Sequence, residues 1–179
     1  MYSLCKTHAF TLIELLVTIT ILAIISMIAI PHYHQFRERQ EVAQLLTTIR
    51  QHVNLSKSLA STYHTQIVIC SSSNATKCEN NQWHKGMIIF SDLNQNKTLD
   101  SNEPIQKTVI TDMKYGSFQW NGGAANPNSI TFQNDSGLPR GSQGNFMYCS
   151  LKHPANHRYI AISPMGHTRI QTTTSCQSL

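Results

Sequence analysis

An apolar run from Phe10 to Ile30 constrains this chain more than any other feature of its sequence. Sixteen of the 21 residues in the run are apolar, and Glu14 is the only charged one. A helix of this length extends about 30 Å, which is the thickness of the hydrocarbon core of a bilayer. The run is longer than the apolar part of a cleaved secretory signal, and Pro31 follows it without a small-residue cleavage pattern. The sequence therefore predicts a helix that anchors an exported domain.

A plain membrane anchor does not explain Glu14. An ionised side chain near the start of an apolar helix costs about 2.5–3.5 kcal/mol on insertion scales unless it reaches the interface or a partner. Cleavage between Ala9 and Phe10 would supply such a partner, because the new α-amino group of Phe10 is positively charged. In a bundle of packed helices, the amine of one subunit can pair with Glu14 of its neighbour.

The segment Ala9-Phe-Thr-Leu-Ile-Glu-Leu-Leu-Val17 resembles the processing site of type IV pilins and type II secretion pseudopilins. The resemblance implies cleavage before Phe10 by a prepilin peptidase and N-methylation of the new terminus. It also implies assembly with other pilins through the apolar helix, with Glu14 setting the register. Ala9 stands where this family usually has Gly, and the peptidase requires a small residue at that position.

Helical periodicity continues after Pro31. Apolar residues recur at i, i+3, i+4 and i+7 from Val42 to Val53, which predicts one helix from Phe10 to about Ala60, bent at Pro31. From Tyr63 onward, short runs rich in β-branched and aromatic residues alternate with turns containing Gly, Asn and Pro. These runs are 66–70, 87–90, 107–110, 117–120, 129–133, 145–149, 159–162 and 168–172. The predicted fold class is α+β, a long N-terminal helix packed on antiparallel β-structure.

Five cysteines give an odd number, which cleavage makes even by removing Cys5. An even number in an exported chain indicates disulfides. Of the three possible pairings, the sequence favours one that closes a short local loop and ties down the C-terminal end. The favoured pairs are Cys70–Cys78 and Cys149–Cys176. The alternative is a zinc site formed by Cys70, Cys78 and His84, which lacks the C-x-x-C spacing of common zinc sites.

Later motifs are similar to the GspH/FimT group of minor pilins and minor pseudopilins, over nearly the whole chain. The motifs are Cys70-x7-Cys78, Trp83-x2-Gly86-x3-Phe90-x-Asp92-x-Asn94-x-Asn96 and Ser163-Pro-Met-Gly166-His-Thr-Arg169. The resemblance implies a single-pass protein of the bacterial inner membrane, with its globular domain in the periplasm, that later enters a pilus or pseudopilus. The implied segments are a leader peptide (1–9), a transmembrane and filament-core helix (10–30), an amphipathic continuation (31–60) and a β-rich domain with a basic C-terminal tail (61–179).

The segment 92–103 has the spacing of an EF-hand calcium loop. Oxygen-bearing side chains occupy its positions 1, 3, 5, 7, 9 and 12, which are Asp92, Asn94, Asn96, Thr98, Asp100 and Glu103. Lys97 replaces the Gly of the sharp turn, and no helix pattern flanks the loop. The alternative is an Asx-rich connection between strands, since Asn and Asp bond to nearby backbone in turns. Nothing in the sequence indicates that the protein needs a cofactor, and this loop makes calcium a possible ligand.

The segment from Ser136 to Leu179 contains no acidic residue, although the formal net charge of the whole chain is only +5. Its Lys and Arg residues are Arg140, Lys152, Arg158 and Arg169. An exposed basic tail of this kind suits a phosphate backbone, because Arg binds phosphate in a bidentate manner. The alternative is a solvated surface on a mildly basic protein.

The family resemblance favours DNA as the partner of this tail. FimT-type minor pilins of competent bacteria bind DNA through a C-terminal Gly-Arg-x-Arg motif, which reads Gly166-His167-Thr168-Arg169 here. The resemblance implies non-sequence-specific, salt-sensitive binding. His167 replaces an Arg, so the loss of a permanent charge is expected to weaken binding near neutral pH and to make binding more dependent on pH. The predicted DNA-binding residues are Arg140, Lys152, Arg158, Gly166, His167 and Arg169.

No hydrolase, phosphate-loop, metalloprotease or dinucleotide-binding motif predicts an enzyme. The sequence favours a minor type IV pilin that primes pilus assembly or captures DNA for natural transformation. The first alternative is a GspH-type minor pseudopilin of a type II secretion system. The second is a calcium-stabilised structural pilin module.

Overall fold

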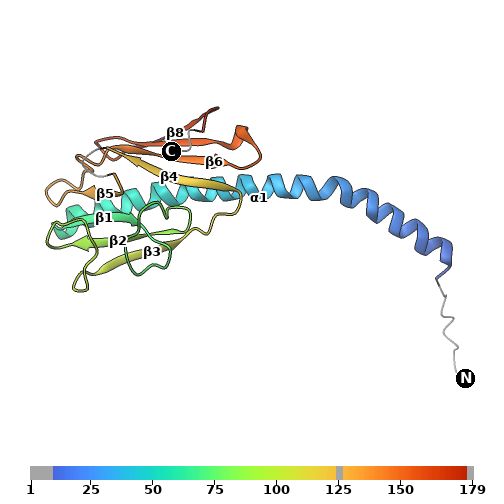
Figure 1. The fold of residues 1–179 in the computed structure, drawn as a ribbon, viewed down its shortest axis with the longest axis horizontal. Helices are drawn as coiled ribbons and strands as arrows, with labels where there is room; N and C mark the ends of the chain where they lie inside the picture. The colour runs from blue at the N-terminus through green and yellow to red at the C-terminus, as the bar shows by residue number, and fades with distance from the viewer. Residues whose placement is uncertain (1–9, 124–126, 177–179) are drawn as a thin grey trace, which may run out of the picture. The chain divides into compact units, whose positions relative to one another are not determined.

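The computed structural model describes residues 10–123 and 127–176 (Figure 1). A long helix, α1, comes first and is followed by strands β1 to β8, with a short 3-10 turn, η1, between β6 and β7. The helix spans Leu12–Tyr63. The strands are β1 (Gln66–Ser71), β2 (Gly86–Asp92), β3 (Ile105–Ile110), β4 (Gly116–Gly122), β5 (Ser129–Phe132), β6 (Gly144–Ser150), β7 (Arg158–Ile162) and β8 (Thr168–Thr172), and η1 is Pro154–Asn156. The chain divides into two compact units between Arg39 and Gln40.

The first turn of α1 is a capping box. The N–H of Glu14 donates to Thr11 Oγ1 at 3.3 Å, and the N–H of Thr11 donates to Glu14 Oε2 at 2.9 Å. The Thr11 hydroxyl donates to the same carboxylate oxygen at 2.9 Å. These bonds satisfy N–H groups that a helix start otherwise leaves unpaired. Glu14 therefore has a partner within its own chain before any neighbour is considered.

The first half of α1 is apolar on all sides. Within the described part of the chain, α1 is the one helix long and apolar enough, by length and composition, to cross a membrane. Pro31 lies inside α1, and the helix continues through it to Tyr63. Proline has no N–H and so removes one i to i−4 hydrogen bond at this point.

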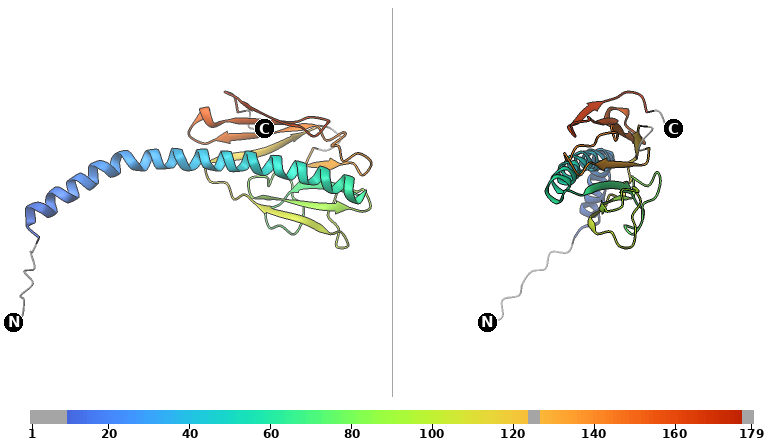
Figure 2. Two further views of the ribbon diagram at one scale, coloured as in Figure 1. Left: turned by 180° about the vertical axis from the view of Figure 1, so that it is seen from behind. Right: turned by 90° about the vertical axis from the view of Figure 1, so that its left-hand side faces the viewer.

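The second half of α1 buries a single stripe. Val42, Leu45, Ile49 and Val53 are at most 4% exposed, and Ala60 is fully buried. This is the face that the i, i+3, i+4, i+7 spacing predicts. The stripe packs into a core that also contains residues from the strands that follow α1 (Figures 1 and 2).

The strands form two antiparallel sheets of four strands each. The first has the order β3-β2-β1-β5, and the second has the order β4-β6-β7-β8. Both sheets contribute to the core cluster that contains the α1 stripe. The helix with its antiparallel sheets confirms the predicted α+β class, and the division into two sheets adds a level of organisation that the strand pattern alone leaves open.

Aromatic side chains fill the core between the sheets. The ring of Phe146 from β6 lies 4.8 Å from Phe118, 4.7 Å from Trp120 and 5.0 Å from Trp83 between ring centroids. Such offset and edge-to-face pairs add to the stabilisation from burial. Trp83, Trp120 and Tyr148 are at most 5% exposed, so their role is in packing.

A second, smaller core covers the other face of the first sheet. Val68, Cys70, Ile88 and Phe90 are buried there, with Cys78 and Leu99 packed against them. Cys78 and Leu99 belong to the loops that follow β1 and β2. Both faces of the β1–β2 pair are thereby shielded from water, which explains why every residue of these strands is buried.

The C-terminal segment is not the exposed tail that its composition predicts. It supplies β6, β7 and β8, three of the four strands of the second sheet. Phe146, Tyr148, Ile160 and Ile162 point into the core and are at most 2% exposed. Alternation along the strands places these apolar residues inside and the polar residues outside, so a segment that is basic overall also builds the core.

Glu41 joins α1 to the connection between β3 and β4. Its carboxylate accepts hydrogen bonds from the N–H groups of Lys114 at 2.8 Å and Tyr115 at 3.2 Å. It also accepts one from the hydroxyl of Tyr148 at 3.4 Å. A carboxylate that satisfies two backbone donors and a buried phenol fixes the position of this connection on the helix.

We expect Glu41→Ala to lower the free energy of unfolding by about 1–3 kcal/mol, because the substitution leaves these donors without their acceptor. Chemical unfolding followed by circular dichroism would measure the loss. Gln51→Ala, at an exposed position of the same helix, is the control and should change stability little. Equal effects of the two variants would contradict this role of Glu41.

Candidate assembly and nucleic-acid interface

The predicted assembly residues lie at the start of α1. Phe10, Ile13, Glu14, Val17 and Thr18 line a shallow, open and mainly apolar groove. The side chain of Phe10 is 79% exposed. Ala9, the other predicted processing residue, lies outside the described residues. The arrangement is an apolar helical surface with one carboxylate, which suits packing against another apolar helix.

The predicted DNA motif forms a tight hairpin between β7 and β8. Gly166 has a φ of +70°, and its N–H donates to the carbonyl oxygen of Ser163 at 2.8 Å. The N–H of Ser163 donates to the carbonyl oxygen of His167 at 3.0 Å, which closes the turn. His167 and Arg169 are exposed. Arg169 lies on β8, an edge strand of its sheet, opposite Ala161 of β7.

Gly166 has a packing role. A Cβ atom built on it would lie 2.7 Å from Cδ and 3.2 Å from Nζ of Lys57. Its left-handed φ also favours glycine. Lys57 Nζ donates to the carbonyl oxygen of Met165 at 3.1 Å, which holds the turn against α1. Among the predicted DNA-binding residues, Gly166 is therefore a positioning residue.

Two basic residues of α1 approach this hairpin, and the sequence did not single them out. One is Lys57, and the other is Arg50, whose Nε donates to Thr168 Oγ1 at 3.4 Å. Arg50 is exposed and Lys57 is half-buried. The two positions are seven residues apart and so face the same side of the helix. Their 118-residue and 108-residue separations from the hairpin partners explain why sequence spacing gives no signal of these contacts.

The other predicted DNA-binding residues lie apart from one another: Arg140 is in the connection between β5 and β6, Lys152 follows β6 and Arg158 begins β7. Arg140 pairs with Asp135 at 3.2 Å. The hydroxyl of Ser136 and then the Arg140 guanidinium hold the pKa of Asp135 below its ordinary value. Arg158 donates to the carbonyl oxygens of Ala155 and His157, each at 2.8 Å. The charges of Arg140 and Arg158 are thus partly used within the protein.

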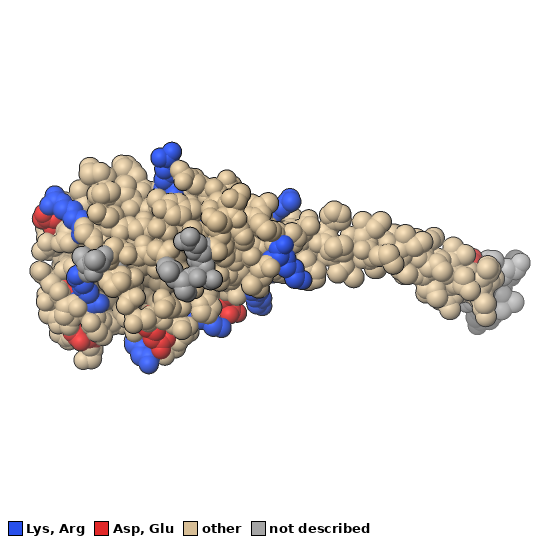
Figure 3. Space-filling view, turned by 45° about the horizontal axis from the view of Figure 1, so that its top comes forward, with Lys and Arg blue, Asp and Glu red and all other residues tan. Residues whose placement is uncertain are grey.

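The structure does not gather the predicted basic residues into one cluster. Lys152 is exposed after β6, and Arg158 begins β7, where it lies opposite Thr172 near the end of β8. Figure 3 shows a largely uncharged face on the globular unit, with Lys and Arg mainly around its margin. The residues that the structure does bring together are Gly166, His167 and Arg169 of the hairpin, with Arg50 and Lys57 of α1.

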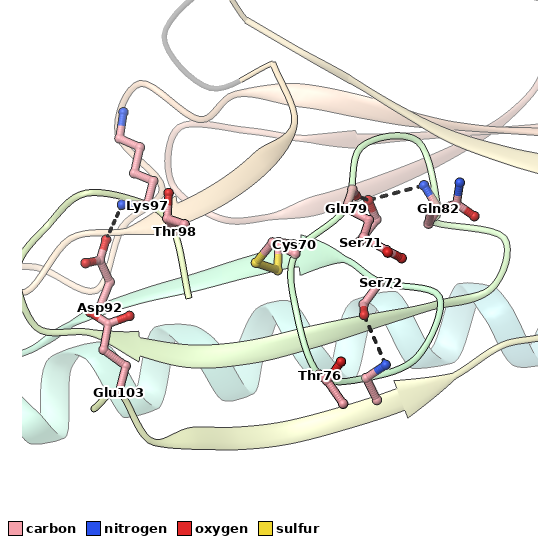
Figure 4. Close-up of a disulfide and its surroundings, with 12 residues drawn as sticks. Cys70, Ser71, Ser72, Thr76, Glu79, Gln82, Asp92, Lys97, Thr98 and Glu103 are labelled. Carbon is pink, nitrogen blue, oxygen red and sulfur yellow. Dashed lines mark hydrogen bonds between the residues drawn. A yellow bond between two sulfur atoms is a disulfide. The ribbon is translucent and has the colours of Figure 1, made fainter. Parts of the chain in front are cut away.

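The structure contains two disulfides. Cys70 bonds to Cys78 with a Cα–Cα distance of 5.6 Å, and Cys149 bonds to Cys176 with a Cα–Cα distance of 5.8 Å. The first lies where β1 meets the loop that covers the small core (Figure 4). The second joins β6 to the segment after β8. Because the sulfurs of Cys70 and Cys78 bond to each other, the zinc alternative with His84 is wrong.

The loop between β2 and β3 is held by its own polar side chains. Asp92 accepts hydrogen bonds from the N–H groups of Asn96 at 3.1 Å and Lys97 at 2.8 Å (Figure 4). Glu103 accepts them from the N–H groups of Leu93 at 2.8 Å and Asp100 at 3.0 Å.

The remaining predicted calcium ligands bond within the same loop. The side-chain amides of Asn94 and Asn96 donate to Asp100 Oδ2 at 2.8 Å and 2.9 Å, and the N–H of Thr98 donates to Asn96 Oδ1 at 2.7 Å. Lys97 has a φ of +63°, so it adopts the left-handed conformation for which Gly is usual. The described residues include no group of three or more His, Cys, Asp or Glu placed to hold a metal ion.

Two family models match this chain, one at its N-terminal segment and one over most of its globular part. The family described as type II transport protein GspH matches residues 46–166, and the prokaryotic N-terminal methylation motif matches residues 4–30. The chain belongs to the GspH family. This confirms the resemblance to the GspH/FimT group of minor pilins and pseudopilins, a group of structural pilins rather than of enzymes.

Among solved structures, the chain is similar to the type IV minor pilin FimU of Pseudomonas aeruginosa strain PAO1. The crystal form in space group P21 matches with a TM-score of 0.51 and 17% identity, over 77% of this chain and 92% of that chain. A second form, in space group P65, has a TM-score of 0.49 and 14% identity, over 72% and 91% of the two chains. The first match confirms the minor pilin fold. No curated protein matches the sequence significantly.

The GspH family and the methylation motif fit a protein that is anchored in the inner membrane and associates with other pilins. The apolar start of α1, with Glu14 in its first turn, is the part of the chain that the methylation motif covers. The hairpin lies at the end of the GspH match, which stops at Gly166. His167 and Arg169 therefore fall just beyond the matched residues.

The hydrogen bonds of the β2–β3 loop lead to a prediction about calcium. We expect the chelator EGTA to leave the unfolding temperature unchanged, because the loop carboxylates already bond to backbone N–H groups. Asp92→Ala should lower the free energy of unfolding by about 1–3 kcal/mol, with or without chelator. Calorimetry of the wild type and variant would measure both. A saturable rise in unfolding temperature when calcium is added to the wild type would contradict the expectation.

Proposed function

We propose that this protein is a minor type IV pilin that is cleaved between Ala9 and Phe10, methylated on Phe10 and inserted into the pilus through α1. In this proposal, residues 1–9 are the leader, 10–30 span the inner membrane and later the filament core, and 31–60 continue the helix. Residues 61–179 form the domain in the periplasm. The observation that carries it is the match to the methylation motif at an apolar helix start, with the GspH family match following in the same chain.

Glu14 has two roles in this proposal. Within its own chain it completes the capping box with Thr11. In the filament, its carboxylate pairs with the methylated α-amino group of a neighbouring subunit. The two roles are compatible, because a carboxylate oxygen has more than one acceptor site, and the exposed groove around Phe10 and Glu14 leaves the group accessible.

The domain binds DNA in this proposal, and one observation supports this best. Arg169 is exposed on an edge strand, next to the exposed His167. Within the described residues, acidic side chains pair with Lys77, Lys85 and Arg140 but not with Arg169. A guanidinium at an open edge can contact phosphate oxygens without giving up an internal partner.

The alternative function is that of a minor pseudopilin in a type II secretion system. The description of the matching family favours it. Deletion of the gene would separate the two: loss of pilus-dependent motility or transformation with normal protein secretion supports the pilin, and loss of secretion alone supports the pseudopilin. The calcium-stabilised module, the remaining alternative, depends on the calcium titration of the β2–β3 loop.

The two roles of Glu14 predict different effects for two substitutions. Thr11→Val removes the capping hydroxyl and keeps the carboxylate. Glu14→Val removes the carboxylate with its charge and its half of the capping box, and keeps Thr11 Oγ1 as acceptor for the N–H of residue 14. We expect Glu14→Val to abolish incorporation into pili and Thr11→Val to preserve most of it, measured by immunoblotting of sheared filaments against the amount in membranes. Equal loss in both variants would show that capping alone explains Glu14.

DNA binding is tested with the full mature chain in detergent and a labelled duplex of mixed sequence. We expect affinity to fall as salt rises and Arg169→Gln to weaken binding about tenfold, since a hydrogen bond to a charged group contributes about that much. His167→Arg should strengthen binding at neutral pH by adding a permanent charge. Lys107→Gln, exposed on β3 of the other sheet, is the control. Binding that is absent, or that is insensitive to salt, would contradict the proposal.

A further inference from the structure

Two acid-free stretches of the sequence meet at the edge strand β8. After Glu41, no acidic residue occurs until Glu79, and none occurs after Asp135. The first stretch includes most of the second half of α1, and the second stretch includes the β7–β8 hairpin. The contacts from Arg50 to Thr168 and from Lys57 to Met165 bring the two stretches side by side. The seam therefore brings together basic residues from two stretches that contain no acidic residue.

The seam is defined by Arg50 and Lys57 on α1 and by His167 and Arg169 on the hairpin. Side chains alternate across a strand. Ile170 packs on the core and Thr168 contacts Arg50, so Arg169 lies on the opposite face of β8. β8 is the outermost strand of its sheet, so no further strand of that sheet lies beyond it. A ligand can therefore reach both faces of β8 around this edge. A linear polyanion that crosses this edge meets Arg50 on one side and Arg169 on the other.

The spacing of the helix residues suits a phosphate backbone. Arg50 and Lys57 are separated by about 10 Å along α1, close to the axial rise of three nucleotides in one strand of a DNA duplex. Arg50 uses Nε for Thr168, which leaves the two terminal nitrogens of its guanidinium for phosphate oxygens. Lys57 uses one of its three N–H donors for Met165.

Close packing fixes the Lys57 end of the seam. Gly137 and Gly166, both with left-handed φ values, lie against Lys57: a Cβ on Gly137 would be 2.6 Å from the Lys57 carbonyl oxygen, and one on Gly166 would be 2.7 Å from Lys57 Cδ. Two turns of the chain thus converge on one lysine. Charges held by such packing lose less conformational freedom when a ligand binds.

We propose that Arg50 and Lys57 of α1, together with His167 and Arg169 of the β7–β8 hairpin, form one phosphate-binding seam across the edge of β8 for the DNA backbone. The proposal rests on the DNA binding proposed above and adds the helix to the binding surface. The bases take no part, so the seam binds any sequence and depends on salt.

The test measures binding of a labelled duplex at a range of salt concentrations by the full mature chain in detergent. The wild type is compared with four variants, which are Arg50→Gln, Lys57→Met, Lys107→Gln and Thr168→Val. Arg50→Gln should weaken binding about tenfold and reduce the magnitude of the slope of log K against log salt by about 0.9. Lys57→Met, which keeps the packing of the aliphatic stem, should act in the same direction. Lys107→Gln on β3 controls for the loss of one positive charge elsewhere. Unfolding temperatures measured in parallel identify variants that lose structure.

Thr168→Val separates a binding role of Arg50 from a structural one. It removes the hydroxyl that accepts from Arg50 and changes no charge. If Arg50 contacts DNA, Thr168→Val should keep nearly the affinity and salt slope of the wild type. Arg50→Gln should show the weaker binding and the smaller salt slope given above. If Arg50 only anchors the hairpin, Thr168→Val should reproduce the loss.

The outcomes distinguish this inference from the proposed function. If the wild type binds DNA but Arg50→Gln and Lys57→Met match Lys107→Gln, the seam is wrong and DNA binding stands. If the wild type does not bind DNA at any salt concentration, both are wrong. Inorganic polyphosphate should compete with DNA for the wild type. Failure to compete would overturn the assignment of the seam to phosphate groups.

Discussion

The buried stripe on the second half of α1 is the interaction on which the rest of the globular unit depends. Val42, Leu45, Ile49 and Val53 belong to the same core cluster as residues from both sheets. Removal of this stripe would expose the parts of the core that it covers, since α1 is the one α-helix among the described residues. The helix therefore acts as the shared surface that fixes the sheets, and Glu41 adds a polar attachment on the same element.

This role of α1 has a consequence for the residues that flank the stripe. They are presented on a helix whose buried face packs on both sheets. Arg50 and Lys57 contact the β7–β8 hairpin from this helix, and Lys57 also lies against Gly137. A structural packing arrangement thereby sets the relative positions of basic groups that are distant in sequence, which is the pre-organisation that favours binding of an extended anion.

Sequence patterns predicted the parts of the fold that depend on local spacing. The apolar run locates the first half of α1, the i, i+3, i+4, i+7 spacing locates its second half, and the β-branched runs locate the strands. Division of the strands into two sheets depends on pairings such as Cys70 with both Ile88 and Ser129, which join segments far apart in the chain. The contact of Arg50 with Thr168 also joins segments far apart in the chain. Local spacing therefore predicts neither the division into two sheets nor this contact.

Composition was least informative for the C-terminal segment. Counting charges over residues 136–179 predicts a basic tail, because a count does not record which side of a strand each residue occupies. Alternation places Ile160 and Ile162 in the core, while Arg169 lies outside on the edge strand.

The motif Gly166-His167-Thr168-Arg169 contains one residue that packing requires and two residues that are exposed. Gly166 is required by its φ of +70° and by the closeness of Lys57, so glycine at this position would be needed even in a chain that never met DNA. Arg169 has no such packing requirement, and the same is true of the exposed His167. In the proposed DNA binding, the charged positions of the motif and the helix residues beside them would contact phosphate, while Gly166 positions the turn.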